Sequence, residues 1–323
     1  MAEPIEKEIS VPSPGKVAIP VLLTSPPTGV KHSGFALLLG PGAGGDEKTA
    51  LLTAVADEVA RQGHFCARYR AKVPNLGFRV SVCMRVMEHL FHPTKGIHPQ
   101  KGCFLGGHSM GTRVAGTVAA QLAGGDTESE PAAAKKAPAA KGKKATVAPA
   151  KKRASSTTAS VDSNFPADFV PGLVLYSYPL HTADNTKALR DQILLDIPST
   201  TATLFVSGLK DNMCQPSIFA KVFKEMKSTP REVVQVTDAD HGLGFGSSKP
   251  AQAKKEALAE AISEWTVAFM DEAISQRSEE GGSSMKTTAA GKKGGAGVGE
   301  VTKKKADLKK EADEWTVAVS TVA

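Results

Sequence analysis

Aromatic residues, long apolar runs and secretory signals are scarce or missing in this chain of 323 residues. Aromatic residues make up 5% of it and hydrophobic residues 41%, a combination that predicts one folded domain diluted by segments that do not fold. No run approaches the roughly 18 consecutive apolar residues of a membrane-spanning helix, so no membrane contact is expected. The first residues are polar and acidic, unlike a secretory signal.

Cysteine pairs are also missing. The four cysteines, Cys66, Cys83, Cys103 and Cys214, stand far apart, and none belongs to a C-x-x-C pair. Three of them lie among apolar residues, where a free thiol behaves as a small hydrophobic side chain. We therefore expect no disulfide and no metal site, and we also expect no cofactor. The absence of disulfides favours a reducing compartment, the cytoplasm, with the nucleus as a second location.

Positive charge is concentrated in two segments with almost no large apolar residues, 126–163 and 278–305. The formal net charge is +7, and most of the excess lies there. Ordering such segments costs conformational entropy without compensating burial, so both are predicted to be disordered. Three interpretations stay open for them: a nuclear import signal, a weak and unspecific contact with nucleic acid, or a solvated loop without a partner. The basic runs are Lys135-Lys136, Lys141 to Lys144, Lys151-Lys152-Arg153 and Lys303 to Lys305.

Strand-like and helix-like pieces alternate through the rest of the chain. This alternation predicts a mostly parallel central sheet with helices on both faces. Residues 9–23 indicate instead an antiparallel hairpin at the edge of the sheet. The predicted strands are 34–40, 64–69, 102–106, 173–176, 203–206 and 232–236, and the predicted helices are 47–62, 78–90 and 110–122.

A short repeat marks the C-terminal part. The segment Glu264-Trp265-Thr266-Val267-Ala268 recurs as Glu314-Trp315-Thr316-Val317-Ala318. We interpret it as a partial duplication of the last helix of the domain. This interpretation predicts one domain over residues 5–275 and a short helix over residues 306–323.

A serine motif stands where a predicted strand meets a predicted helix. Gly107-His108-Ser109-Met110-Gly111 matches G-x-S-x-G, which alone is a weak signal. Its place directly after an apolar strand and before a helix is the setting of a nucleophile elbow, whose tight turn requires glycines. The alternative is an ordinary glycine-rich turn. We predict that Ser109 is a nucleophile.

Two later loops supply a base and an acid for Ser109. A serine needs a histidine to take its proton and a carboxylate to orient that histidine. Asp211 follows one predicted strand and His241 follows the next, which is the order Ser, acid, His typical of this elbow. All three residues should meet at the carboxyl edge of the sheet. Asp238 and Asp240 compete as acids, but they are too near His241 to suit a separate acid-bearing loop.

A glycine-rich loop at residues 40–46 completes the predicted site. An oxyanion needs two backbone N–H donors. Met110, after the nucleophile, should supply one, and Ala43 or Gly44 the other. The same glycines also match a dinucleotide-binding loop, but Pro41 stands in the turn and no acid ends the next strand, which weakens that alternative.

With these residues in place, the chain resembles one branch of the α/β-hydrolases. That branch contains the testis-expressed hydrolase-like proteins and the hydrolase-like subunit of the NSL histone acetyltransferase complex. The sequence departs from the family at Pro41, where relatives tend to have histidine, and at His108, where they often have arginine. The matching segments are 42–46, 65–68, 105–113, 176–181, 189–191, 204–208, 211–214 and 240–241.

The resemblance implies an α/β-hydrolase fold and hydrolysis of a small acyl substrate, an ester, thioester or amide, through Ser109, His241 and Asp211. It also implies an alternative, because some family members look like scaffolds in chromatin complexes. A non-catalytic interaction module with protein partners is therefore the second hypothesis. The complete set of three side chains favours the enzyme, since a scaffold needs none of them.

Overall fold

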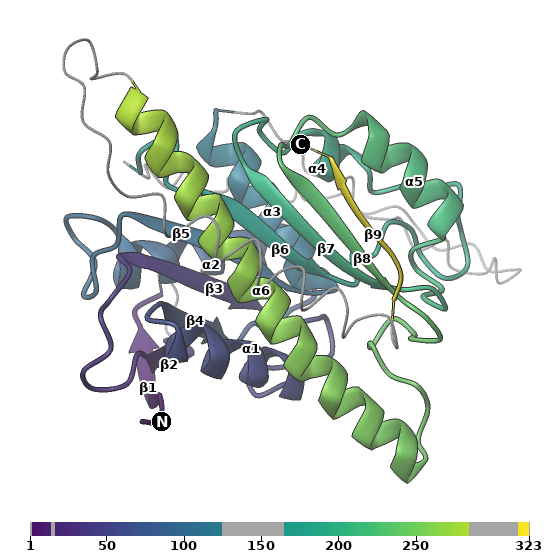
Figure 1. The fold of residues 1–323 in the computed structure, drawn as a ribbon, viewed down its shortest axis with the longest axis horizontal. Helices are drawn as coiled ribbons and strands as arrows, with labels where there is room; N and C mark the ends of the chain where they lie inside the picture. The colour runs from purple at the N-terminus through teal and green to yellow at the C-terminus, as the bar shows by residue number, and fades with distance from the viewer. Residues whose placement is uncertain (1, 14–16, 125–164, 284–315, 323) are drawn as a thin grey trace, which may run out of the picture.

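A twisted sheet organises the residues described by the computed structural model, which are 2–13, 17–124, 165–283 and 316–322. Helices pack on both faces of the sheet (Figure 1). The strands are β1 (Ile5–Val11), β2 (Ile19–Ser25), β3 (Phe35–Gly40), β4 (Phe65–Tyr69), β5 (Gly102–His108), β6 (Gly172–Tyr176), β7 (Ala202–Gly208), β8 (Arg231–Val236) and β9 (Thr316–Val322). The helices are α1 (Ala50–Arg61), α2 (Leu76–Phe91), α3 (Met110–Leu122), α4 (Gln192–Leu195), α5 (Pro216–Glu225) and α6 (Lys249–Ser283).

Parallel pairing runs through the centre of the sheet, whose strand order is β1-β2-β4-β3-β5-β6-β7-β8-β9. The neighbouring strands in the part of this order that runs β4-β3-β5-β6-β7-β8 are all parallel to one another. β1 and β2 form an antiparallel hairpin, and β2 joins β4 in antiparallel fashion. The predicted architecture, a mostly parallel sheet with helices on both faces and an N-terminal edge hairpin, is confirmed.

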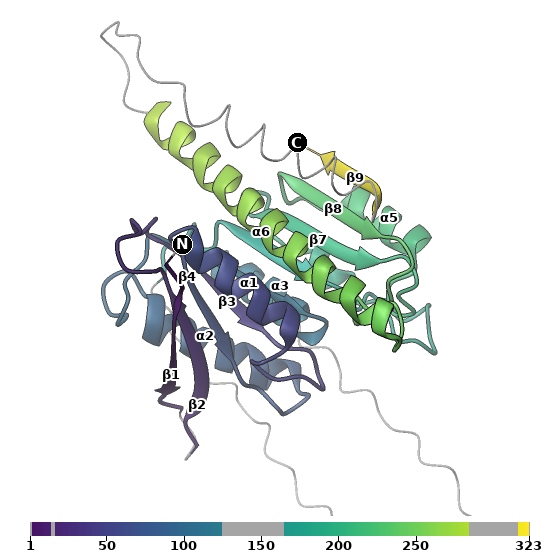
Figure 2. The ribbon, with the colours of Figure 1, turned by 60° about the horizontal axis from the view of Figure 1, so that its bottom comes forward.

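Two hydrophobic cores lie on opposite faces of the sheet. In β3, Ala36 and Leu38 belong to the core beneath α2, α3 and α5. Leu37 and Leu39 belong to the core beneath α1 and α6, which lie together on one face in Figure 2. Successive side chains of a strand point to opposite faces, so a strand covered on both sides needs a continuous apolar run.

Residues next to α1 and α2 determine where these helices begin or end. The side chain of Asn75 caps α2 by accepting a hydrogen bond from the Phe78 amide at 2.8 Å. Gly63 follows α1 with φ of +91°, a conformation that glycine adopts without strain. α1 begins at Ala50 rather than at residue 47, because Asp46 accepts from the Lys48 amide and holds the preceding residues in a turn.

All four cysteines are buried and free, including the one that the sequence did not place among apolar residues. Within the described ranges, no group of three or more His, Cys, Asp or Glu side chains is placed to hold a metal ion. None of the helices in those ranges is both long and apolar enough to cross a membrane.

The C-terminal part departs from the prediction. α6 continues to Ser283, past the predicted domain end at residue 275 and into the segment 278–305 that was predicted to be disordered. The predicted helix over residues 306–323 is wrong where the structure describes it, because residues 316–322 form β9, antiparallel to β8. β-branched residues dominate this stretch and favour a strand beside the open edge of β8. Residues 126–163, 284–305 and 306–315 lie outside the described residues.

Candidate active site

Three side chains predicted from the sequence meet at the carboxyl edge of the sheet. Ser109 joins β5 to α3, Asp211 follows β7, and His241 follows β8. The Oγ of Ser109 lies 2.7 Å from Nε2 of His241, and Nδ1 of His241 lies 2.9 Å and 3.0 Å from the two carboxylate oxygens of Asp211. Since the carboxyl ends of parallel strands share one edge, residues far apart in sequence form one hydrogen-bonded series.

The backbone at Ser109 is strained. Its φ is +51°, which side-chain-bearing residues rarely adopt. A Cβ atom at Gly107 or at Gly111 would collide with the carbonyl oxygen of Gly40, the last residue of β3. The motif therefore needs both glycines, because the end of β3 approaches the turn closely from one side.

The partners of His241 define its tautomer. The Asp211 carboxylate accepts hydrogen bonds only, so Nδ1 of His241 carries the proton and Nε2 accepts from the Ser109 hydroxyl. The Asp211 side chain is fully buried and also accepts from the Met213 amide at 2.7 Å. The imidazole of His241 keeps 21% of its surface exposed, so a substrate can reach it.

The competing acids have other partners. Asp238 pairs with the ammonium of Lys210 at 2.7 Å, and this hydrogen bond lowers the pKa of the Asp238 carboxyl. Asp240 accepts from the backbone amides of Gly242 and Gly244. Asp211 is accordingly the acid that contacts the imidazole of His241.

The glycine-rich loop after β3 packs against the nucleophile. A Cβ atom built on Gly42 would lie 3.0 Å from Nδ1 of His108 and 3.6 Å from Cβ of Ser109. Ala43 and Gly44, the predicted donors of this loop, follow directly. Met110 is the first residue of α3, so its N–H has no acceptor within the helix.

His108 has a contact that the sequence did not reveal. Its Nε2 donates to the carbonyl oxygen of His241 at 2.8 Å, and the two imidazole rings lie 5.5 Å apart. Burial lowers the pKa of His108, so the ring holds the backbone of His241 as a neutral donor.

His181 supports the loop that carries the acid. It is buried, its Nδ1 donates to the Thr182 carbonyl at 3.0 Å, and its Nε2 accepts from the Gln215 amide at 3.0 Å. Its own amide donates to the carbonyl of Met213, whose amide in turn donates to Asp211. Sequence reasoning missed this role, although residues 176–181 were among the segments that resemble the family.

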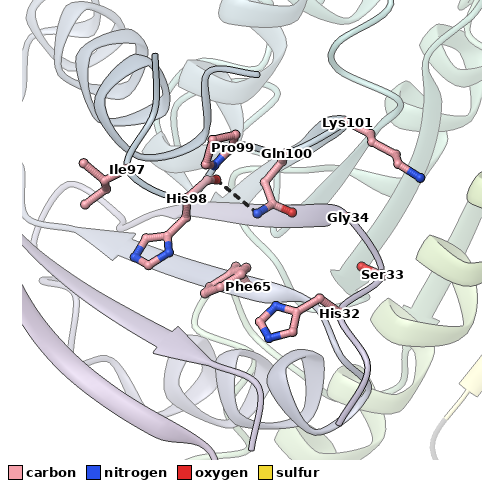
Figure 3. Close-up of a pocket in the computed structure, with 9 residues that line it drawn as sticks. All are labelled: His32, Ser33, Gly34, Phe65, Ile97, His98, Pro99, Gln100 and Lys101. Atoms are coloured by element: carbon pink, nitrogen blue, oxygen red, sulfur yellow. Dashed lines mark hydrogen bonds between the residues drawn. The ribbon is translucent and has the colours of Figure 1, made fainter. Parts of the chain in front are cut away.

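A separate pocket of about 360 Å³ lies at the opposite edge, around the starts of β3, β4 and β5 (Figure 3). The ring of Phe65 stands between His32 and His98, with centroids 5.0 Å and 4.8 Å away. Burial, with contributions from His32 and Lys7, lowers the pKa of His98. The candidate catalytic residues do not contribute to the lining of this pocket.

Comparisons with known proteins agree with this architecture. A family model described as an alpha/beta hydrolase domain matches residues 152–271, which include Asp211 and His241 but not Ser109. The dienelactone hydrolase of Anabaena variabilis is 16% identical, with a TM-score of 0.51 over 81% of this chain and 96% of that one. Est1E of Butyrivibrio proteoclasticus is 12% identical, with a TM-score of 0.52 over 81% and 98%.

Identities this low bear on the fold alone. The chain has the α/β-hydrolase fold, with its antiparallel N-terminal strands and the helices around the sheet. The narrower resemblance to the testis-expressed and NSL-complex branch stays a prediction.

Proposed function

We propose that this protein is a serine hydrolase that cleaves an ester, thioester or amide of a small acyl substrate. The hydrogen-bonded series from Ser109 through His241 to Asp211 carries the proposal. It unites a nucleophile, a base with its acceptor nitrogen aimed at that nucleophile, and a buried carboxylate that orients the base. The strained elbow supports the same function, because strain at a functional residue persists only where the surrounding structure enforces it.

The proposed reaction begins with attack on the carbonyl carbon. Ser109 Oγ forms the new bond while Nε2 of His241 takes its proton, and the N–H of Met110 with that of Ala43 or Gly44 binds the oxyanion. The tetrahedral species then collapses, the bond to the leaving group breaks, and His241 returns the proton to that group. Water attacks the acyl-serine with His241 again as base, which releases the acid and restores the hydroxyl.

Asp211 acts on the imidazole throughout these steps. Its carboxylate keeps the proton on Nδ1 of His241 in the resting protein and stabilises the imidazolium that forms during attack. The Met213 amide holds Oδ1 of Asp211 in place, so the acid is oriented before the substrate binds.

The non-catalytic scaffold has weaker support, because a scaffold explains neither the strained backbone at Ser109 nor the 2.7 Å contact between its Oγ and His241.

Turnover of a panel of activated acyl substrates tests the proposal. The panel contains 4-nitrophenyl esters of increasing acyl length, a thioester and an anilide. Ser109→Ala should lower kcat/KM by about 10³-fold or more. Ser177→Ala is the matched control, because Ser177 also has a positive φ, +52°, but its hydroxyl has no hydrogen-bond partner in the structure. Equal rates for the wild type and Ser109→Ala across the panel would favour the scaffold.

A further inference from the structure

A buried guanidinium lies directly beneath the glycine-rich loop. Arg79, in the first turn of α2, is 1% exposed. Its Nη1 donates to the carbonyl oxygens of Pro41 at 2.9 Å and Gly42 at 3.1 Å. Its Nη2 donates to the carbonyl oxygen of Ala43 at 3.4 Å, and its Nε donates to that of Val73 at 2.8 Å. One side chain therefore binds three successive carbonyls of the loop.

The positive charge of Arg79 is paired with carbonyl dipoles instead of a carboxylate. Among the described residues, no ion pair with an acidic side chain involves Arg79. Burial lowers its pKa, yet arginine keeps its proton at neutral pH. A buried cation without an acidic partner is costly, and here the loop carbonyls are the groups that compensate the charge.

Peptide geometry links Arg79 to the predicted donors. In a trans peptide, C=O and N–H point in opposite directions. Because the carbonyls of Gly42 and Ala43 point at Arg79, the N–H groups of Ala43 and Gly44 point away from it. The Gly42 carbonyl also accepts from the Gly45 amide at 3.4 Å, which closes the turn. Proline at position 41 is compatible with this arrangement, because proline has the backbone carbonyl to which Arg79 donates.

We propose that Arg79 is a positioning residue for the oxyanion loop. Arg79 keeps the carbonyl groups of Gly42 and Ala43 pointing toward its guanidinium. The N–H groups of Ala43 and Gly44 then face the position of the oxyanion beside Ser109. The charge of Arg79, held in a surrounding of low dielectric constant, also favours the negative charge that develops in the transition state. The inference rests on the proposed hydrolase function and adds a residue that touches no reacting atom.

Two substitutions test the role of Arg79 in the full chain. Arg79→Met removes the charge and the hydrogen bonds at similar length, and Arg79→Lys keeps the charge without the planar fork. Arg231→Met is the matched control, because Arg231 is also buried and donates to a backbone carbonyl, that of Ser228 at 3.0 Å, but begins β8 at the amino edge. Each variant is assayed for kcat, KM, thermal unfolding and inhibition by a trifluoromethyl ketone, which forms a tetrahedral oxyanion on the serine.

Arg79→Met should lower kcat by about 10- to 100-fold while KM changes less than about threefold. The affinity for the trifluoromethyl ketone should fall by a factor similar to that of kcat. Arg79→Lys should lie between Arg79→Met and the wild type. Arg231→Met should lose thermal stability while keeping kcat. If Arg79→Met does not fold, the test depends on Arg79→Lys. A lower kcat and a lower inhibitor affinity of Arg79→Lys, measured below the unfolding temperature of that variant, then support the positioning role.

A folded Arg79→Met or Arg79→Lys with the kcat and inhibitor affinity of the wild type overturns the inference and leaves the hydrolase function standing. A kcat loss without weaker inhibition also overturns it, because the oxyanion loop would then be intact. Absence of Ser109-dependent turnover in the wild type would instead remove the proposed function, and the inference falls with it.

Discussion

The two edges of the parallel sheet differ in how the backbone is strained. At the carboxyl edge, positive φ angles fall on Gly107 but also on residues with side chains, among them Ser109, Ser177 and Asp238. At the amino edge they fall on glycine, at Gly34 and Gly63, which adopts them without steric cost. A side-chain-bearing residue in such a region costs on the order of 1–3 kcal/mol. The edge that carries this cost is the edge that holds the proposed nucleophile.

Histidines lie at both edges, and their partners differ. At the carboxyl edge, His241 contacts a hydroxyl and a carboxylate, and His181 bridges two backbone groups. At the amino edge, His32 and His98 pack against the ring of Phe65. The groups within hydrogen-bond reach of a histidine, rather than the histidine itself, therefore distinguish the candidate catalytic edge from the edge where histidines only pack.

The largest expected effect concerns the acid of the carboxyl edge. Asp211→Asn should lower kcat by about 10³- to 10⁴-fold, because an amide NH₂ next to Nδ1 favours the wrong tautomer of His241. Asp238→Asn is the matched control, since that carboxylate is exposed and pairs with Lys210. The steady-state rates of both variants on the best ester of the panel provide the measurement. Similar losses in the two variants would contradict the assignment of Asp211.

A smaller effect compares two buried histidines at opposite edges. His181→Leu leaves the Gln215 amide without its acceptor, and His92→Leu leaves the amides of Thr94 and Lys95 without theirs. Both should lower the free energy of unfolding by about 1–3 kcal/mol. Only His181→Leu should also lower kcat, by roughly tenfold, because a loosened acid loop misplaces Asp211.

Urea unfolding and kcat below the unfolding transition separate these two contributions. His181→Gln offers a conservative rescue, since its side-chain oxygen can accept from the Gln215 amide and should restore part of kcat. An unchanged kcat in a folded His181→Leu would make His181 purely structural.

The smallest expected effect is a dependence of stability on pH. His98 and His108 have pKa values below the ordinary 6.5 because burial disfavours the charged ring. The unfolded chain therefore takes up protons first as the pH falls through about 6.5, so the free energy of unfolding should decrease from pH 7.5 to 5.5.

Urea unfolding at both pH values checks this dependence. His98→Asn at the amino edge should remove part of the decrease and leave kcat at neutral pH unchanged. His108→Asn should remove part of the decrease and also lower kcat, because His108 holds the backbone of His241. A free energy of unfolding of the wild type that increases from pH 7.5 to pH 5.5 would contradict the predicted direction of this pH dependence.

The alternation of strands and helices was predictable from the sequence because strands buried on both faces, such as β3, need uninterrupted apolar runs. The meeting of Ser109, Asp211 and His241 followed from the same alternation. Each residue comes after a predicted strand, and the carboxyl ends of parallel strands share an edge.

Other features depend on contacts that no local pattern encodes. Arg79 and His181 form hydrogen bonds with backbone groups of loops that are distant in sequence. No sequence motif or residue spacing therefore predicts the roles of these two side chains. The repeat misled the prediction for a similar reason. The segment Thr266-Val267-Ala268 is helical in α6, whereas Thr316-Val317-Ala318 is extended in β9 beside the edge of β8, so tertiary context decides between the two states.

The most direct test of the central claim is covalent labelling of the intact protein with a fluorophosphonate, which reacts with serines that a neighbouring base activates. Intact-mass and peptide mass spectrometry should find one adduct, on Ser109. Labelling should vanish in Ser109→Ala and after heat denaturation, and it should persist in Ser177→Ala. A folded wild type without an adduct, or with its adduct on another serine, would contradict the assignment of Ser109 as the nucleophile.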